Sequence, residues 1–182
     1  PEWLGIRNRP SVSAAHRYTI DQHMIQVVSR LGRGDGRSDG HGGSRGVDAS
    51  VRGAAPIGAV PSDASMPGLS EHYDDERYAA LLLAGLLHDI GKRPGVRDHA
   101  AEGARHAPVI LRRMGFDEHV VGMAALLVRE HLTLSEFATG RDPNDPAAGT
   151  ELAERVGRDP VMLDMLFDLT RADGSSLGAT SD

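Results

Sequence analysis

Apolar residues recur at steps of three and four positions along most of this chain, which is the spacing of one face of an α-helix. After Tyr18, for example, Ile20, Met24, Val27 and Leu31 would form one apolar stripe. The same spacing predicts helices over residues 18–31, 74–90, 98–114, 117–131, 147–156 and 160–172. No segment alternates between apolar and polar positions over a useful length, as a strand would. The sequence therefore predicts an all-α fold.

Individual residues indicate where two of these helices begin and end. Asp98 is expected to cap the third helix at its N-terminus, and Gly115 is expected to end it. The last helix begins at Pro160, because proline suits the first turn of a helix, and Asp173 is expected to end it. The residues of this helix that we expect to face inward are Leu163, Leu166, Phe167 and Thr170.

Two segments depart from the helical pattern. Residues 1–15 have no usable period and are interpreted as a lead-in segment. Residues 32–70 are rich in Gly and Ser, so they cannot bury enough apolar surface to offset their ordering entropy, and we expect a flexible insertion there. We therefore expect one domain over residues 16–182, interrupted by this insertion. Because the chain starts without a methionine, we expect a fragment of a longer multidomain protein.

The predicted helix at 74–90 is apolar nearly all round, so it should be central. It delivers His88 and Asp89, Gly91 is expected to end it, and Lys92 follows. An imidazole beside a carboxylate, at the end of so apolar a stretch, suits a hard or borderline divalent ion at the floor of a pocket. A lone His-Asp pair is more often a capping or hydrogen-bonding pair, so a metal site requires further ligands elsewhere in the chain.

Further candidates lie within or at the ends of apolar helical faces. Imidazole and carboxylate groups in such places need partners if they are buried. Convergence of four or more would make a nitrogen and oxygen site for one ion, and six would suffice for two ions that share Asp89. The candidates are His23, His88, Asp89, His99, His131 and Asp173.

Composition restricts the chemistry. The absence of cysteine excludes disulfides, thiolate zinc sites and a cysteine nucleophile, so the candidate ions are Mn²⁺ or Mg²⁺, with Fe or Zn as alternatives. The formal net charge of −6 disfavours a nucleic-acid partner. No apolar run is long enough to cross a bilayer and no secretory signal is present, so we expect no membrane association and a cytoplasmic protein.

Several short motifs follow one another along the chain. They are residues 16–23, Leu86-Leu87-His88-Asp89-Ile90-Gly91-Lys92, Asp98-His99 with Gly103-Ala104, residues 128–132, Ala138-Thr139 with Arg141-Asp142, and Ala172-Asp173. In this order they resemble the HD superfamily of metal-dependent phosphohydrolases, and within it the HD domain of the bacterial PII uridylyltransferase/uridylyl-removing enzymes. The resemblance covers nearly the whole chain except the insertion. The chain departs from that family after Asp173 and at Gly140, and these departures concern the substrate-facing residues rather than the metal ligands.

The resemblance implies an HD-domain helical bundle with a metal site between its central helices. It also implies hydrolysis of a phosphodiester bond, which removes a uridylyl or adenylyl group from a tyrosine of the nitrogen regulatory protein PII. In that family the HD domain follows a nucleotidyltransferase domain and precedes two ACT domains that sense glutamine, none of which is present in this sequence. Two alternatives remain open, an HD phosphohydrolase of a free or cyclic nucleotide and a non-catalytic regulatory HD module.

The resemblance also suggests residue roles. His23, His88, Asp89 and Asp173 would form the core metal site, with His99 and His131 completing a second. His88, Asp89 and Lys92 would be catalytic. Lys92, Arg17 and Arg129 would bind substrate; the alternative for each of these cations is a solvated surface group. His16 would be a supporting or substrate group, and we expect His106 and His119 to face solvent.

Overall fold

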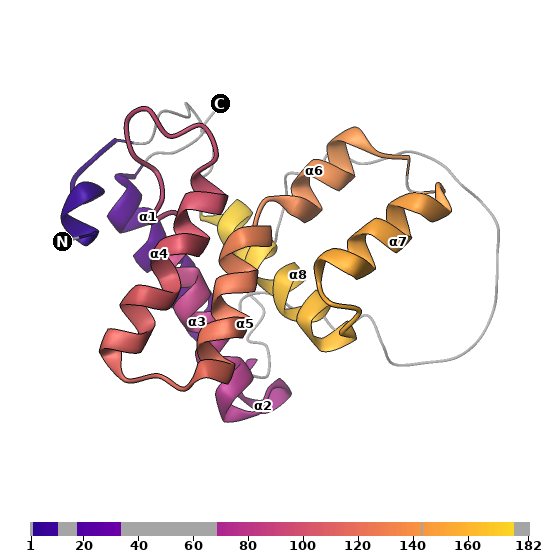
Figure 1. The fold of residues 1–182 in the computed structure, drawn as a ribbon, viewed down its shortest axis with the longest axis horizontal. Coiled ribbons are helices and arrows are strands. Elements are labelled where there is room, and N and C mark those ends of the chain that lie inside the picture. The colour runs from indigo at the N-terminus through magenta and orange to yellow at the C-terminus, as the bar shows by residue number, and fades with distance from the viewer. Residues whose placement is uncertain (1, 11–17, 34–68, 143, 177–182) are drawn as a thin grey trace.

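The computed structural model of the protein describes residues 2–10, 18–33, 69–142 and 144–176 (Figure 1). Within these ranges the regular elements are all helical, apart from an isolated bridge between Pro10 and Thr19. The predicted all-α fold is confirmed. The elements are η1 (Trp3–Gly5), α1 (Ile20–Arg33), α2 (Leu69–His72), α3 (Asp75–Leu87), α4 (His99–Met114), α5 (Glu118–Glu130), α6 (Thr133–Gly140), α7 (Pro146–Arg155) and α8 (Pro160–Ser175).

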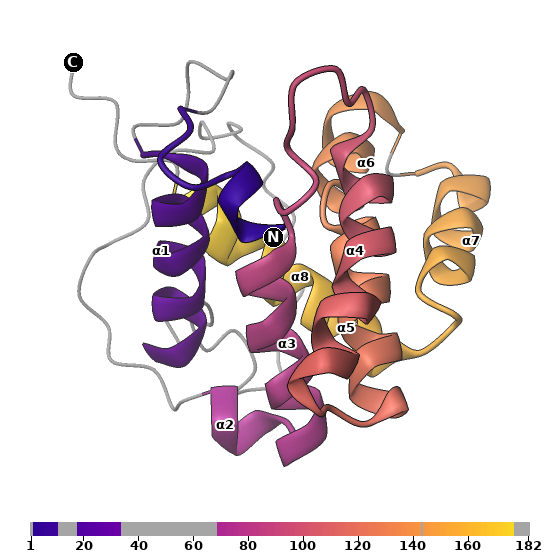
Figure 2. The same ribbon diagram turned by 60° about the vertical axis from the view of Figure 1, so that its left-hand side comes forward.

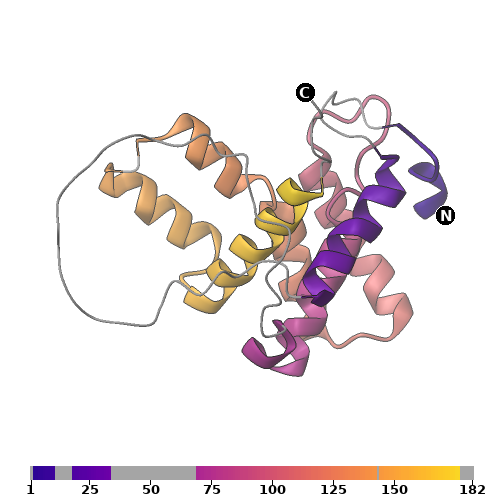
Figure 3. The ribbon, with the colours of Figure 1, turned by 180° about the vertical axis from the view of Figure 1, so that it is seen from behind.

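Helix α3 is the centre of the bundle. It packs between α1 and α5, α4 packs on α5, and α8 packs on α1, α3 and α5 (Figure 1, Figure 3). Leu81 and Ala84 of α3 are fully buried in one hydrophobic core with Leu127 of α5 and Leu166 of α8. This position explains why the sequence of α3 is apolar nearly all round. Helices α6 and α7 project to one side of the bundle (Figure 1).

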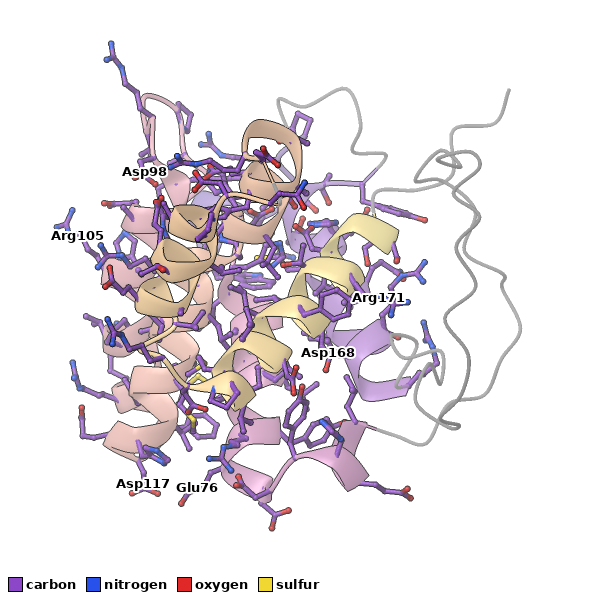
Figure 4. All side chains as sticks on the ribbon, turned by 90° about the vertical axis from the view of Figure 1, so that its right-hand side faces the viewer. Glu76, Asp98, Arg105, Asp117, Asp168 and Arg171 are labelled. Carbon is purple, nitrogen blue, oxygen red and sulfur yellow. The ribbon has the colours of Figure 1, made fainter. Side chains whose placement is uncertain are left out.

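A buried polar contact fastens α8 to the start of α3. The hydroxyl of Tyr73, which lies between α2 and α3, donates a hydrogen bond of 2.6 Å to Oδ2 of Asp168. Asp168 is 1% exposed, and Figure 4 places it on α8. A buried carboxylate without such donors would be costly, so this contact helps to fix the helix that carries Asp173.

Aspartates cap several of the helices that carry candidate site residues. The Asp98 side chain accepts a hydrogen bond from the Ala101 amide, and Gly115 ends α4 in the left-handed conformation at φ 89°, so both predictions for this helix are confirmed. Asp159 accepts hydrogen bonds from the amides of Val161 and Met162 at the start of α8. These side chains satisfy amides that have no partner within the helix.

Asp159→Ala is expected to lower the free energy of unfolding by about 1 kcal/mol, because two amides at the start of α8 lose their acceptor. Asp117→Ala is the matched control, since Asp117 occupies the same position of α5 without a side-chain hydrogen bond. Chemical denaturation of both variants measures the difference. Equal losses of stability in the two variants would contradict the capping role of Asp159.

Some predicted helix boundaries are wrong. Helix α3 ends at Leu87 rather than near residue 90, and the chain tightens into a turn in which the Ile90 amide bonds to the Leu87 carbonyl. Helix α8 runs to Ser175, so Asp173 lies inside its last turn instead of ending it. Phe167 is 48% exposed, because the buried face of α8 is formed by Met165, Leu166 and Leu169.

Two other expectations concern connecting segments. Helix α6 was not predicted, because its short sequence offers too few apolar positions to reveal a period. Most of the insertion expected at 32–70 falls on residues 34–68, which lie outside the described residues. Its ends are helical where they are described, since α1 runs to Arg33 and α2 begins at Leu69.

Candidate metal centre

The candidate ligands come from one end of the bundle, where α1 and α4 begin and where α3, α5 and α8 end (Figure 2). His23 lies in the first turn of α1, and His99 is the first residue of α4. His88 follows α3 and His131 follows α5, each as the residue that caps its helix. Four separate helix ends and the last turn of α8 thus bring together residues that are far apart in the sequence.

These residues form two groups of three. In the first, Nε2 of His23 lies 2.8 Å from Oδ1 of Asp173 and 3.3 Å from Nε2 of His88. His88 Nε2 lies 3.7 Å from the same Asp173 oxygen. One ligand atom from each residue lies within 4.8 Å of the other two, so this group could hold a metal ion.

The second group contains Asp89, His99 and His131. Nε2 of His99 lies 3.3 Å from Nε2 of His131, and Oδ1 of Asp89 lies 3.5 and 3.8 Å from these two nitrogens. The other oxygen of Asp89, Oδ2, lies 3.5 Å from Nε2 of His88 in the first group. The Asp89 carboxylate therefore lies between the two groups and turns one oxygen toward each.

Backbone carbonyls orient two of the imidazoles. Nδ1 of His88 lies 2.9 Å from the Gly85 carbonyl oxygen, and Nδ1 of His131 lies 2.7 Å from that of Val128. Since a carbonyl oxygen only accepts, each Nδ1 carries the proton and donates it. When the ring is neutral, the lone pair of Nε2 therefore faces the cluster, which is the tautomer a metal ligand requires.

A glycine allows the turn that carries Asp89 to approach α4 closely. A Cβ at Gly91 would overlap the carbonyl oxygen of His99 and would lie 2.6 Å from the amide nitrogen of Gly103. Sequence reasoning had assigned Gly91 only to the end of a helix. The structure shows that the missing side chain also lets Asp89 and His99 come within range of each other.

Burial and neighbouring charges have opposing effects on the pKa values of these groups. Burial disfavours a charged His88, but the negative charges of Asp89 and Asp173 outweigh it and raise the pKa of His88 to about 9. Burial and the charge of His88 lower the pKa of His131 to about 4. Burial disfavours ionised Asp89 too, yet His88 and Lys92 hold its pKa well below the usual range. The two carboxylates thus favour a positive charge on His88.

The donor set fits a divalent ion. It consists of imidazole nitrogens and carboxylate oxygens, which suit Mn, Mg, Fe or Zn. The separation of 3.3 Å between paired Nε2 atoms in both groups is that expected of two nitrogens bound about 2.1 Å from a common ion. Oδ1 of Asp89 is buried and has no hydrogen-bond partner, and a bound cation would satisfy it.

Solvent reaches only part of the cluster. Asp89, His23, His88 and His131 are each no more than 1% exposed, whereas the side chains of His99, Lys92 and Asp173 are 22%, 21% and 21% exposed. Solvent therefore reaches the cluster at these three residues, which we call its opening.

The predicted substrate-binding cations differ in their surroundings. Lys92 donates a hydrogen bond of 2.7 Å from Nζ to Oδ2 of Asp89, so it belongs to the cluster. The side chain of Arg129 is 69% exposed and lies 3.4 Å from Oε1 of Glu130, and nothing in the structure brings it to the cluster. Arg17 and His16 lie outside the described residues.

The histidines expected to face solvent behave differently from each other. His119 is 68% exposed and contacts Glu76, as expected. His106 is only 25% exposed, because it packs along α4 and contacts Glu102 one turn earlier.

Sequence reasoning missed a polar network behind His131. Glu130 is 7% exposed, and its Oε2 accepts a hydrogen bond of 2.7 Å from the Thr133 hydroxyl. The Arg155 guanidinium of α7 lies 3.4 Å from the same oxygen. This network joins α7 to the junction of α5 and α6. A glutamate at the end of an apolar helix, directly before a candidate ligand, was the available signal.

The fold and the site together define a class. An all-helical bundle with a His and Asp cluster at its central helices is the arrangement of an HD-like domain. Within the described ranges, no helix is both long enough and apolar enough to span a bilayer.

Curated enzymes of similar sequence are consistent with this assignment to an HD-like domain. The chain is 35% identical over 179 residues to the bifunctional uridylyltransferase/uridylyl-removing enzyme of Streptomyces coelicolor. It is 32% identical over 178 residues to the enzyme of that name from Mycobacterium tuberculosis and 30% identical over 178 residues to that from Caulobacter vibrioides. Each match covers 98% of this chain but only 16 to 17% of the relative. The predicted resemblance to these enzymes is confirmed. No protein-family model matches the chain, and no solved structure does.

Proposed function

We propose that this chain is a metal-dependent HD phosphodiesterase that removes a uridylyl or adenylyl group from a tyrosine of PII in the cytoplasm. The observation that carries this proposal is the pair of ligand groups joined by Asp89. The relatives supply the reaction, since their names include uridylyl removal. Because the chain spans 17% of the length of the first of these enzymes, the PII substrate belongs to the proposal.

In the proposed site, His23, His88 and Asp173 hold one divalent ion, and Asp89, His99 and His131 hold a second. A bound Mn²⁺ or Mg²⁺ would lower the pKa of a water molecule and neutralise charge on the phosphoryl oxygens. The chain itself fixes the geometry. The carbonyls of Gly85 and Val128 hold two imidazoles in the ligand tautomer.

Lys92 has two tasks in this proposal. Its ammonium restrains Oδ2 of Asp89, and its partial exposure at the opening leaves it able to attract a phosphate. The leaving group is a tyrosine phenolate whose conjugate acid has a pKa of about 10, so it needs little help from a general acid. Arg17 and Arg129 remain proposed substrate contacts.

The domain organisation is part of the proposal. The HD domain would occupy residues 16–182 after a lead-in at 1–15, and the insertion predicted at about 32–70 would interrupt it. In a longer protein it would follow a nucleotidyltransferase domain and precede ACT domains that respond to glutamine.

The proposal is tested by incubating the chain and Mn²⁺ with uridylylated or adenylylated PII and measuring released UMP and AMP. The chain should release nucleotide, and His88→Ala should lose release. His119→Ala is the matched control, since it removes an exposed imidazole away from the cluster. If the chain hydrolysed free or cyclic nucleotides but released none from PII, the proposed substrate would be wrong and the proposed metal site would stand. No turnover of any of these substrates would contradict the proposed hydrolase.

A further inference from the structure

We propose that Arg7, Arg9 and Arg97 form a basic docking surface beside the opening of the cluster, which binds acidic side chains around the modified tyrosine of a protein substrate. This inference rests on the proposed function and adds a partner surface to it. All three arginines are exposed residues. Within the part of the chain that the structure describes, none of them pairs with a carboxylate.

The lead-in holds two of these arginines at the start of α1. The Ile20 amide donates a hydrogen bond of 2.9 Å to the Arg9 carbonyl, and the Asn8 amide donates one of 3.1 Å to Oδ1 of Asp21. Ile6 is fully buried and anchors the same segment in the core. The backbone around Arg7 and Arg9 is thus attached to the helix turn that carries His23.

The third arginine lies on the turn between α3 and α4. Arg97 is two residues before His99, so their Cα atoms are at most about 7 Å apart. The side chain of Arg93, on the same turn, packs against η1, since its Nε would lie 3.2 Å from a Cβ at Gly5. This contact joins the turn to the lead-in, so the two arginine-bearing segments border one surface at the end of the bundle where the cluster opens.

Exposed arginines elsewhere in the described ranges are mostly neutralised by neighbours. At the opposite end of α4, Arg112 lies 2.6 Å from Glu118, and on α4 Arg105 lies 2.8 Å from Glu102. Asp98, the exposed carboxylate beside Arg97, is engaged in capping α4. Figure 4 shows Asp98 at one end of the molecule and Asp117 and Glu76 at the other. Unpaired positive charge therefore gathers at the end that carries the cluster.

The charge of the whole chain limits the kinds of partner that could bind this surface. The formal net charge is −6, so an extended polyanion such as nucleic acid would be repelled once it left this surface. A short acidic loop of a folded protein would contact only the arginines and not the negatively charged remainder of the chain. Such a surface raises the association rate and positions the loop over the opening.

The test compares the double variant Arg9→Ala/Arg97→Ala with the control Arg105→Ala/Arg112→Ala, which removes the same charge from exposed positions of α4. Binding of fluorescently labelled uridylylated PII is measured by anisotropy in EDTA, so that the substrate is not turned over. Affinity should fall about tenfold in the first double variant at low salt and stay within about twofold in the control. The difference should vanish at about 0.5 M salt, where charges are screened beyond about 4 Å.

A second arm uses the p-nitrophenyl ester of UMP, which has the phosphodiester without the protein. In Mn²⁺ its hydrolysis should be unchanged by Arg9→Ala/Arg97→Ala. Equal affinities of the two double variants for uridylylated PII would overturn the docking surface, as would an equal loss with the small ester, which would place the arginines on the phosphate. Weaker binding without any UMP release by the parent chain would uphold the surface and contradict the proposed hydrolysis.

Discussion

Asp89→Asn is expected to weaken Mn²⁺ binding by more than about 100-fold and to abolish UMP release. Asp89 is 1% exposed, belongs to the second ligand group and turns its other oxygen toward His88 of the first group. The change therefore removes the negative charge that faces both groups and replaces one of the two carboxylate oxygens by an amide nitrogen. Substitution of a residue that only hydrogen-bonds to a metal ligand typically lowers metal affinity or activity by about 10- to 100-fold. Substitution of a ligand itself should lower them further. Isothermal titration with Mn²⁺ measures the affinity, and nucleotide release from PII measures the activity.

Asp117→Asn is the matched control for this variant. It makes the same chemical change at an exposed position at the opposite end of the bundle, and it should leave both measurements within about twofold. Far-UV circular dichroism verifies that Asp89→Asn remains folded. A folded Asp89→Asn variant that binds Mn²⁺ as tightly as the parent chain would show that Asp89 is not a ligand.

Gly91→Ala is expected to lower the free energy of unfolding by about 3 kcal/mol and to weaken metal binding. The new Cβ would overlap the His99 carbonyl oxygen and press on the Gly103 amide. Both neighbours are backbone atoms, which cannot move aside as a flexible side chain can, so the cost lies at the upper end of that of overpacking. The turn that carries Asp89 must then separate from α4, which carries His99. Urea denaturation and Mn²⁺ titration measure the two effects.

Gly122→Ala is the control, and its expected effect on the free energy of unfolding has the opposite sign. Gly122 lies in α5, and a Cβ there would meet nothing within 4 Å. This substitution should stabilise the chain by about 0.5 to 1 kcal/mol, because alanine loses less backbone entropy than glycine in a helix. If Gly91→Ala were as stable as the parent chain, the close approach of the two segments would not be required.

The helical pattern was sufficient to predict the main features of the bundle. A long apolar stretch identifies α3 as central, since few residues of a buried helix can be polar. The same reasoning selected His23, His88 and His131, because an imidazole on an apolar face is conspicuous. The structure places all three at no more than 1% exposure and brings them to one end of the molecule. That they bind metal remains a prediction.

Other features depend on contacts that no local pattern encodes. Asp173 contacts His23, which is 150 residues away in the sequence, and no pattern within α8 indicates that contact. The exposure of Phe167 depends on which face of α8 meets α3 and α5. The close approach at Gly91 appears only when two segments are placed against each other. Tertiary packing decided each of these, and periodicity describes only one helix at a time.

The most direct test of the metal centre is a crystal of this chain soaked in Mn²⁺ and measured at a wavelength where manganese scatters anomalously. The proposal predicts one or two anomalous peaks, at the group formed by His23, His88 and Asp173 and at the group formed by Asp89, His99 and His131. Both peaks should be absent or strongly reduced in Asp89→Asn. A map with no peak at either group, or with peaks only elsewhere on the surface, would contradict the assignment of this cluster as a metal centre.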